Sequence, residues 1–303
     1  MEAWVESEPF QQVMNACRTN DRNTLNRIVE ERLASANGPE RAFWLRIRAK
    51  QRSRDAFFPH MMEVAWADLE EARRAAPGDL AGQLQTLSDA FGLSLKSERV
   101  DRLVSVLRAI RQESGKLDAL PFFWQDLGVM NMKRGRWRKA ARAFTRALEA
   151  FRRLTASEQG TFACRLAHYH AWRSMCLVAC NNGLGAATDL ETALTLAAGE
   201  PEQNISHLTM GMARAELALH RGLLQEARSA LQHGVMHDAM LNRPKATPAQ
   251  LADTELMAAR IARAEGNQVG FAHFCEKALA VCAQYGLPLT ESRIRAVMAG
   301  ASQ

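Results

Sequence analysis

The chain has 303 residues, of which 47% are apolar and 24% charged, and its formal net charge is +6; this composition is that of a globular protein and excludes a largely disordered one. Only 18 Gly and 9 Pro are present, whereas Ala and Leu supply 51 and 34 residues, so a β-sandwich, a barrel or a doubly wound sheet is excluded as well. Six Cys are too sparse for a disulfide scaffold. No apolar run approaches the ~18 residues of a membrane span, and the acidic start Met1–Glu6 is not a secretory signal. We expect a cytoplasmic protein without membrane contact.

Apolar residues recur every three or four positions along almost the whole chain, which predicts α-helices throughout. Breaks at Gly, Pro or Asn divide this pattern into about fifteen helices. In chain order the breaks lie at 37–39, 77–78, 114–115, 121, 183, 199–201, 244–248 and 286–288. Because no long linker separates them, we expect one continuous all-α body with three parts: an N-terminal helical region (1–120), a central region (121–285) and a C-terminal capping helix (286–303).

The central region carries an internal repeat. Gly135 is followed at offsets of 5, 9 and 12 residues by Ala140, Phe144 and Ala147. Small or apolar residues stand at the same offsets after Gly222 and Gly266. Gly222 and Gly266 are 44 residues apart, and Gly222 lies 87 residues after Gly135. A middle copy is therefore expected to turn near 179–183, with its two helices about two residues out of register. Gly and Ala at these offsets let two antiparallel helices approach closely.

The best copy, over 121–154, resembles the tetratricopeptide repeat; its signature positions hold Trp124, Leu127, Gly128, Gly135, Ala140, Phe144 and Ala147. Asn131 replaces the usual aromatic residue, and a period near 44 exceeds the family's usual ~34 residues. This length is similar to that of the extended repeats of bacterial regulatory proteins. The resemblance implies an α-solenoid, a right-handed superhelical stack of about seven antiparallel helix pairs plus the capping helix. In the N-terminal region the repeats are degenerate.

In the resembled family the first helix of each pair lines a concave groove that binds a peptide or protein. Carried over position by position, the groove residues are Gln125, Val129, Met132, Lys133, His170, Arg173, Leu177, Asn181, Met212, Glu216, His220, Leu256, Arg260 and Arg263. An apolar floor with Lys and Arg suits a segment that has acidic groups, since arginine holds carboxylates bidentately. The Asn-rich clamp that some family members use for a chaperone's C-terminal carboxylate is missing, because Asp126 and Val129 stand at its positions.

The positive charge is concentrated in two windows. The first, residues 46–54, contains Arg46, Arg48, Lys50, Arg52 and Arg54; the second, residues 133–142, contains Lys133, Arg134, Arg136, Arg138, Lys139 and Arg142, with Trp137 among them. These windows are either solvated helix faces, docking faces for an acidic protein, or a nucleic-acid surface on which Trp137 stacks against a base.

No pattern typical of an active site or a metal site is evident. Cys164 to Cys180 spans sixteen residues, too far along one helix for a single zinc ion. His233 and His237 are four residues apart but lack the Glu of a metalloprotease motif. Neither a phosphate-binding loop nor a nucleophile motif is present. We therefore expect neither an enzyme nor a metal or cofactor site, and interpret the Cys residues as packing residues.

Two hypotheses about function follow. The first is a non-enzymatic scaffold, in bacterial regulation or assembly, that binds an acidic peptide or protein in its groove. The second is a nucleic-acid-associated or transcription-linked regulator that uses the two basic windows. Homodimer formation stays open, because repeat arrays often bury a terminal apolar face in a partner.

Overall fold

A computed structural model describes residues 21–55, 59–99, 121–154, 163–200, 206–240 and 246–300, together with residues 12, 13, 16, 102, 105, 106, 109 and 112. Within these residues the secondary structure consists of thirteen α-helices and contains no strand. The predicted all-α fold is thereby confirmed. The helices belong to two compact units, the first formed by residues 1–94 and 100–117 and the second by residues 95–99 and 118–303.

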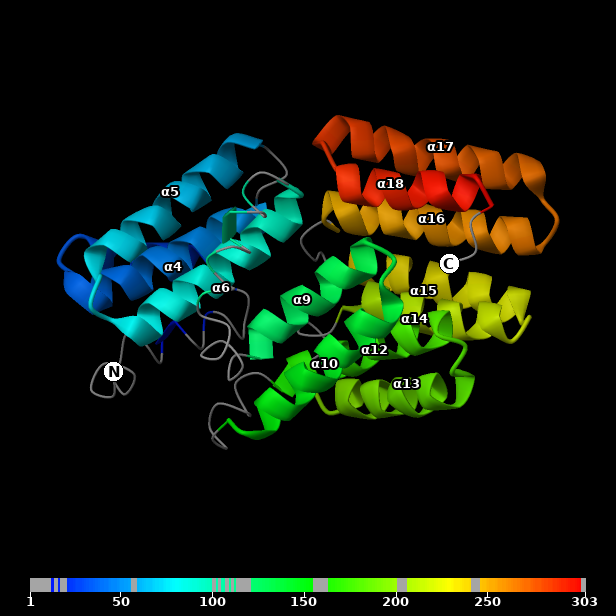
Figure 1. Cartoon of the computed structure of the whole chain (residues 1–303), viewed down its shortest axis with the longest axis horizontal. Helices are drawn as coiled ribbons and strands as arrows, with labels where there is room; N and C mark the ends of the chain where they lie inside the picture. The colour runs from blue at the N-terminus through cyan, green and yellow to red at the C-terminus, as the bar shows by residue number, and fades with distance from the viewer. Residues whose placement is uncertain are drawn as a thin grey trace. The chain divides into compact units, whose positions relative to one another are not determined.

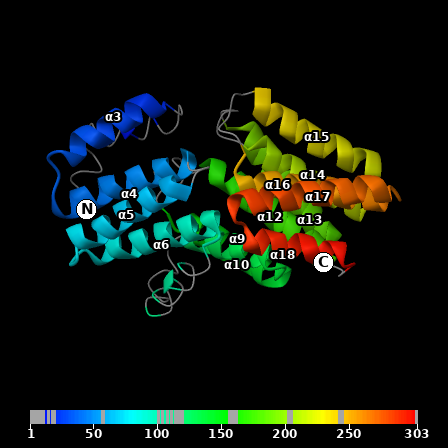
Figure 2. The same ribbon diagram turned by 90° about the horizontal axis from the view of Figure 1, so that it is seen from above.

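The first unit contains α3 (Arg22–Leu33), α4 (Gly38–Asp55), α5 (Pro59–Ala75) and α6 (Leu80–Ser97) as far as Ser94. The carboxylate of Asp21 caps α3 by accepting a hydrogen bond from the backbone N–H of Thr24 at 3.1 Å. α4 packs closely against α5 and also contacts α3 (Figure 2). Their apolar faces meet in one core built around Leu25, Ile28, Val29, Trp44 and Leu45.

The described residues of the second unit form nine helices, eight of which make successive pairs joined by short turns. The first helices of the pairs are α9 (Pro121–Lys133), α12 (Ala163–Ala179), α14 (His207–His220) and α16 (Pro248–Ala264). The second helices are α10 (Trp137–Arg152), α13 (Gly183–Ala198), α15 (Leu224–Met240) and α17 (Gln268–Tyr285), and α18 (Pro288–Met298) follows. The first helices α12, α14 and α16 contact one another in succession, and α16, α17 and α18 lie side by side (Figure 1).

The four turns within these pairs have the same backbone geometry. Gly135, Asn181, Gly222 and Gly266 each adopt a left-handed conformation, with φ of 64°, 60°, 73° and 75°. In every turn this residue donates its N–H to the carbonyl three residues back, and the next residue donates to the carbonyl five residues back, as in a Schellman motif. Asn, which tolerates this conformation better than most residues, replaces Gly in one copy.

Asn181 is the turn residue of the middle copy that the sequence predicts near 179–183. Counted from Asn181, the offsets of 5, 9 and 12 residues reach Ala186, Leu190 and Ala193, all of which are buried. The middle pair is therefore in register with the others, and the expected two-residue slip is wrong. The intervals between the turn residues are 46, 41 and 44, because both the helices and the connections between pairs differ in length.

Small residues stand where the two helices of a pair cross. A Cβ atom on Gly128 would lie 2.7 Å from the ring of Phe144, and one on Gly211 would lie 2.7 Å from the carbonyl oxygen of Ala230 and 3.0 Å from the Cα of Gly234. Ala140 and Ala147 are fully buried. The resulting helix contacts are close enough to exclude a larger side chain.

The apolar core of the second unit is a series of clusters, each shared by neighbouring helices. One cluster joins α10 to α12, the next joins α12, α13 and α14, another joins α14, α15 and α16, and the last joins α16, α17 and α18. Each pair thus buries its apolar surface against its neighbours in the sequence. This arrangement determines which faces of the first and second helices stay accessible.

Candidate functional site

The fourteen predicted groove residues lie on the first helices α9, α12, α14 and α16, or in the turn that follows α12. Their exposure differs widely. Asn181, His220 and Arg263 are exposed, whereas Lys133, Glu216 and Leu256 are buried. The remaining eight, half-buried, are Gln125, Val129, Met132, His170, Arg173, Leu177, Met212 and Arg260.

The half-buried apolar members of this set pack between helices. Val129 and Met132 contact the cluster of Ala140, Phe144 and Cys176, and Leu177 and Met212 contact the cluster shared by α12, α13 and α14. Their contacts join one helix pair to the next. The structure therefore gives them a packing role, which would leave only part of each side chain for a ligand.

Asp189 of α13 binds two of the predicted groove residues. Arg173 donates two hydrogen bonds to its carboxylate, at 2.6 and 2.7 Å, and His170 Nδ1 lies 2.8 Å from the same group. Although burial favours the neutral acid, the hydrogen bonds from Arg173 and His170 hold the pKa of Asp189 below its usual value. The guanidinium of Arg173 is thus neutralised by a carboxylate of its own helix pair.

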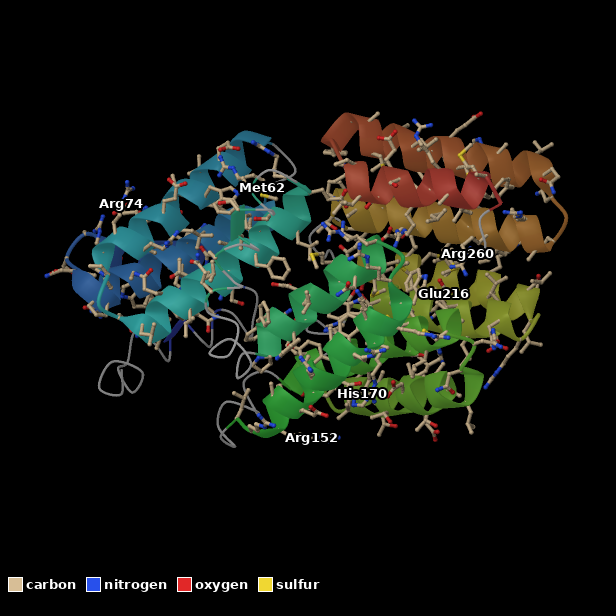
Figure 3. The ribbon with its side chains drawn as sticks, in the orientation of Figure 1. Met62, Arg74, Arg152, His170, Glu216 and Arg260 are labelled. Atoms are coloured by element: carbon tan, nitrogen blue, oxygen red, sulfur yellow. The ribbon has the colours of Figure 1, made fainter. Side chains whose placement is uncertain are left out.

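Arg260 and Glu216 form a second internal ion pair, which joins α16 to α14. Figure 3 shows both side chains between these neighbouring helices. Glu216 is almost fully buried and Arg260 is half-buried. A carboxylate from a binding partner would have to displace Glu216 to reach this guanidinium.

Lys133 belongs to a buried polar cluster. Its ammonium pairs with Glu98, whose side chain is fully buried. The Glu98 carboxylate also accepts hydrogen bonds from the backbone N–H of Leu289 at 2.8 Å and of Thr290 at 3.1 Å, and from the Thr290 hydroxyl at 2.6 Å. Glu98 therefore satisfies the free N–H groups at the start of α18, while Lys133 anchors it to α9.

The pKa of Glu98 reflects the same contacts. Burial opposes the charged carboxylate, but the Lys133 ammonium and the hydrogen bonds from Thr290 hold the pKa below the usual glutamate value. Because the pKa of Glu98 is lower in the folded state than in the unfolded state, its ionised carboxylate stabilises the fold at pH values above the unfolded-state pKa. This stabilisation is lost as the pH falls through the folded-state pKa. The second unit therefore loses stability in acid.

Sequence reasoning placed these cations on one face but missed their internal partners, Asp189, Glu98 and Thr290. Asp189 was detectable in part, because it is one of only two acidic residues in the otherwise apolar helix α13. Glu98 and Thr290 are 192 residues apart in the chain, and no local pattern connects them. Arg263 also has an internal contact, since its guanidinium donates to the Val297 carbonyl at 3.0 Å.

The described cations of the first basic window are paired with acidic residues of the first unit. Arg46 and Lys50 both pair with Asp89 at 2.9 Å, and Arg48 and Arg52 pair with Asp68 at 2.9 and 2.7 Å. Burial favours neutral Asp89, yet Lys50 and Arg46 hold its pKa below the usual value. These four cations hold α4 against α5 and α6. The side chain of Arg54 lies outside the described residues.

The second basic window behaves differently. Arg136, Arg138, Lys139 and Arg142 are exposed, Arg134 is half-buried, and none of the five has an ion pair with any described residue. Arg146 is exposed one turn further along α10, with its guanidinium 4.6 Å from the centre of the Trp124 ring. We call the exposed set the α10 basic face: Arg136, Arg138, Lys139, Arg142 and Arg146.

The Trp residues in and beside this window are packed against other side chains. Trp137 is half-buried and packs against the cluster of Ala140, Phe144 and Cys176. Trp124 is 7% exposed and lies beneath Arg146. The interpretation that Trp137 stacks on a nucleotide is therefore not supported by its position.

The α10 basic face opposes the stability of its own helix. The residues just before α13 and α17 are Asn182 and Asn267, whose side chains cap the first turn, whereas the residue before α10 is Arg136, which makes no side-chain cap. Arg138 and Lys139 follow in the first turn, where positive charge interacts unfavourably with the helix dipole. Arg138 and Arg142, and Arg142 and Arg146, are like charges four residues apart.

Replacing Arg138 by glutamate is accordingly expected to stabilise the protein by about 0.5–1.5 kcal/mol. Glutamate suits the first turn of a helix and can pair with Arg142 four residues later. Urea unfolding followed by circular dichroism measures the difference from the wild type. A loss of stability in this variant would show that Arg138 makes a stabilising contact that the electrostatic argument omits.

The Cys and His residues considered as metal ligands have other contacts. Cys176 is buried, and burial raises the pKa of its thiol. Cys282, which was not among these candidates, is also buried, and burial raises its pKa to about 12. His237 stacks on His207 with ring centres 3.9 Å apart and lies 5.4 Å from His233. In the part of the chain that the structure describes, no three His, Cys, Asp or Glu side chains are grouped to hold a metal ion.

Comparison of the chain with protein-family models, with curated proteins and with solved structures finds no match. Among the described helices, none combines the length and the apolar composition that crossing a bilayer requires.

Proposed function

We propose that this chain is a tetratricopeptide-like scaffold that catalyses no reaction and binds a protein or peptide across the face built from its first helices. The observation that carries the proposal is the recurrence of one helix–turn–helix unit, with a left-handed residue at Gly135, Asn181, Gly222 and Gly266. Units of this kind bury their apolar faces against neighbours and leave an extended surface for partners. The proposal includes the superhelical stack and a role in cytoplasmic regulation or assembly in bacteria.

The polar contacts with the partner are proposed at the ends of the first helices. Asn181, His220 and Arg263 are the exposed members of the predicted groove set. Asn181 and His220 belong to neighbouring turns, since a Cβ atom on Gly183 would lie 3.1 Å from the His220 ring. Arg173, Arg260 and Lys133 have internal counter-ions. In this proposal they therefore support the structure of the face and do not bind an acidic group of the partner.

The nucleic-acid hypothesis receives less support from these contacts. It relied on two basic windows, and in the first of them the four described cations are paired with Asp68 and Asp89. Affinity for nucleic acid grows with the number of phosphates that free cations neutralise. Only the second window retains free cations among the described residues.

Site-specific photo-crosslinking in the native cell tests the proposal. A benzophenone amino acid is placed at position 181 or 220, and in matched controls at the exposed positions Thr195 of α13 or Glu276 of α17. We expect the same protein to be crosslinked from positions 181 and 220 and not from the second helices. Equal crosslinking from all four positions, or crosslinking from 195 and 276 alone, would contradict the proposal.

A further inference from the structure

The net charge of the chain is located on one helix and the turn before it. Six of the 39 Lys and Arg residues lie between 134 and 146, a segment without Asp or Glu, so the remaining chain carries 33 charges of each sign. The other clustered cations described above have acidic partners within the chain, whereas the α10 basic face has none among the described residues. Anions would therefore be attracted to the α10 basic face.

The α10 basic face is a narrow stripe. Ala140, Phe144, Ala147 and Leu148 occupy the buried side of α10, which orients the opposite side outward. Arg138, Arg142 and Arg146 follow one another at intervals of four residues on that outer side. Successive members are separated by about 6 Å along the helix axis, and the three together span about 12 Å.

The first turn of α10 has no side-chain cap, and its positive side chains repel one another. No acidic side chain among the described residues pairs with them. Stability is commonly lost at positions that serve binding. A partner with negative charges would relieve both the repulsion and the unfavourable dipole interaction. The α10 basic face is separate from the first-helix face on which the proposed function rests.

The spacing of the Arg residues in the stripe favours one class of anionic partner over others. Carboxylates at every fourth residue of an α-helix also repeat at about 6 Å, and arginine binds a carboxylate with two parallel hydrogen bonds. Duplex or single-stranded nucleic acid is favoured by a wider basic surface or by exposed aromatic rings. Here Trp124 is buried, Trp137 is half-buried, and the described cations of the first basic window are paired with Asp68 and Asp89.

We infer that the α10 basic face is a second docking surface, separate from the first-helix face, that binds an acidic α-helix of a protein partner. Glutamate or aspartate residues at positions i, i+4 and i+8 of that helix meet Arg138, Arg142 and Arg146. Lys139 and Arg136 flank the stripe and bind acidic groups beside it.

Fluorescence anisotropy with the full chain tests this inference. The probes are a labelled helical peptide with three Glu at i, i+4 and i+8, a peptide of the same composition with the three Glu consecutive, and a labelled 20-base-pair duplex, all at about 150 mM salt. The variant Arg138→Glu/Arg142→Glu removes the stripe. Its matched control is Arg214→Glu/Lys277→Glu, which makes the same change of net charge at two exposed residues elsewhere.

We expect the spaced peptide to bind at least about fivefold more tightly than the consecutive one, and more tightly than the duplex. The stripe variant should lose about tenfold or more in affinity, whereas the control variant should stay within about twofold of the wild type. Loss of binding with an unchanged or raised melting temperature excludes unfolding as the cause. Equal binding of the two peptides, tighter binding of the duplex, or an equal loss in the control variant would overturn the inference.

Discussion

Replacing Lys133 by methionine is expected to destabilise the second unit by about 3–5 kcal/mol at neutral pH, because it leaves the buried carboxylate of Glu98 without a counter-ion. The Glu98 side chain is fully buried and binds the first N–H groups of α18, so it cannot turn toward water without releasing that helix. Urea unfolding followed by circular dichroism measures the loss. Amide exchange in 288–298 should rise at the same time, since α18 loses its anchor to α9.

A second variant and a second pH separate this mechanism from a simple packing defect. The double variant Lys133→Met/Glu98→Gln removes both charges, and we expect it to recover a large part of the lost stability. In Lys133→Met alone, burial without the ammonium raises the pKa of Glu98 above its unfolded value, so its destabilisation should shrink as pH falls from 7 to 5. An equal loss at both pH values, with no recovery in the double variant, would contradict a role for the buried charge.

Replacing Gly211 by alanine is expected to lower stability by about 1–3 kcal/mol, although alanine favours a helix over glycine by about 1 kcal/mol. Its Cβ atom would lie 2.7 Å from the Ala230 carbonyl oxygen and 3.0 Å from the Gly234 Cα. These are backbone atoms of α15, so the two helices of the pair have to separate. Urea unfolding with α14–α15 exchange measurements would locate the effect.

Gly183→Ala is the matched control for this substitution. A Cβ atom at Gly183 meets only the ring of His220, at 3.1 Å, and His220 is exposed and free to turn. We expect this variant to be as stable as the wild type or more so. If Gly211→Ala were equally well tolerated, close crossing of α14 and α15 would not be what requires glycine.

The local features of the fold were predictable from the sequence because they depend on residues close together in the chain. A left-handed turn residue followed by small residues at fixed offsets specifies one helix pair, and Gly128 beside Phe144 is a direct consequence of that pattern. The register of the middle pair was missed because Asn181, and not Gly183, has the positive φ. The sequence did not distinguish two candidate turn residues that lie two positions apart.

The charge pairing of the candidate site was not predictable in the same way. Arg260 meets Glu216 from 44 residues away, and Lys133 meets Thr290 from 157 residues away. Such pairs depend on how whole helix pairs pack, which no local spacing encodes. A Lys or Arg on a predicted face therefore does not identify a ligand contact until the neighbouring helices are placed.

Hydrogen exchange of the full chain, with and without the partner identified by crosslinking, tests the proposed scaffold function most directly. The account predicts slower exchange on partner binding at the ends of the first helices, in 177–181, 216–220 and 260–264. The outward-facing parts of α13, α15 and α17 should exchange at the same rate in both samples. Protection confined to these second helices, with the first helices unchanged, would contradict it.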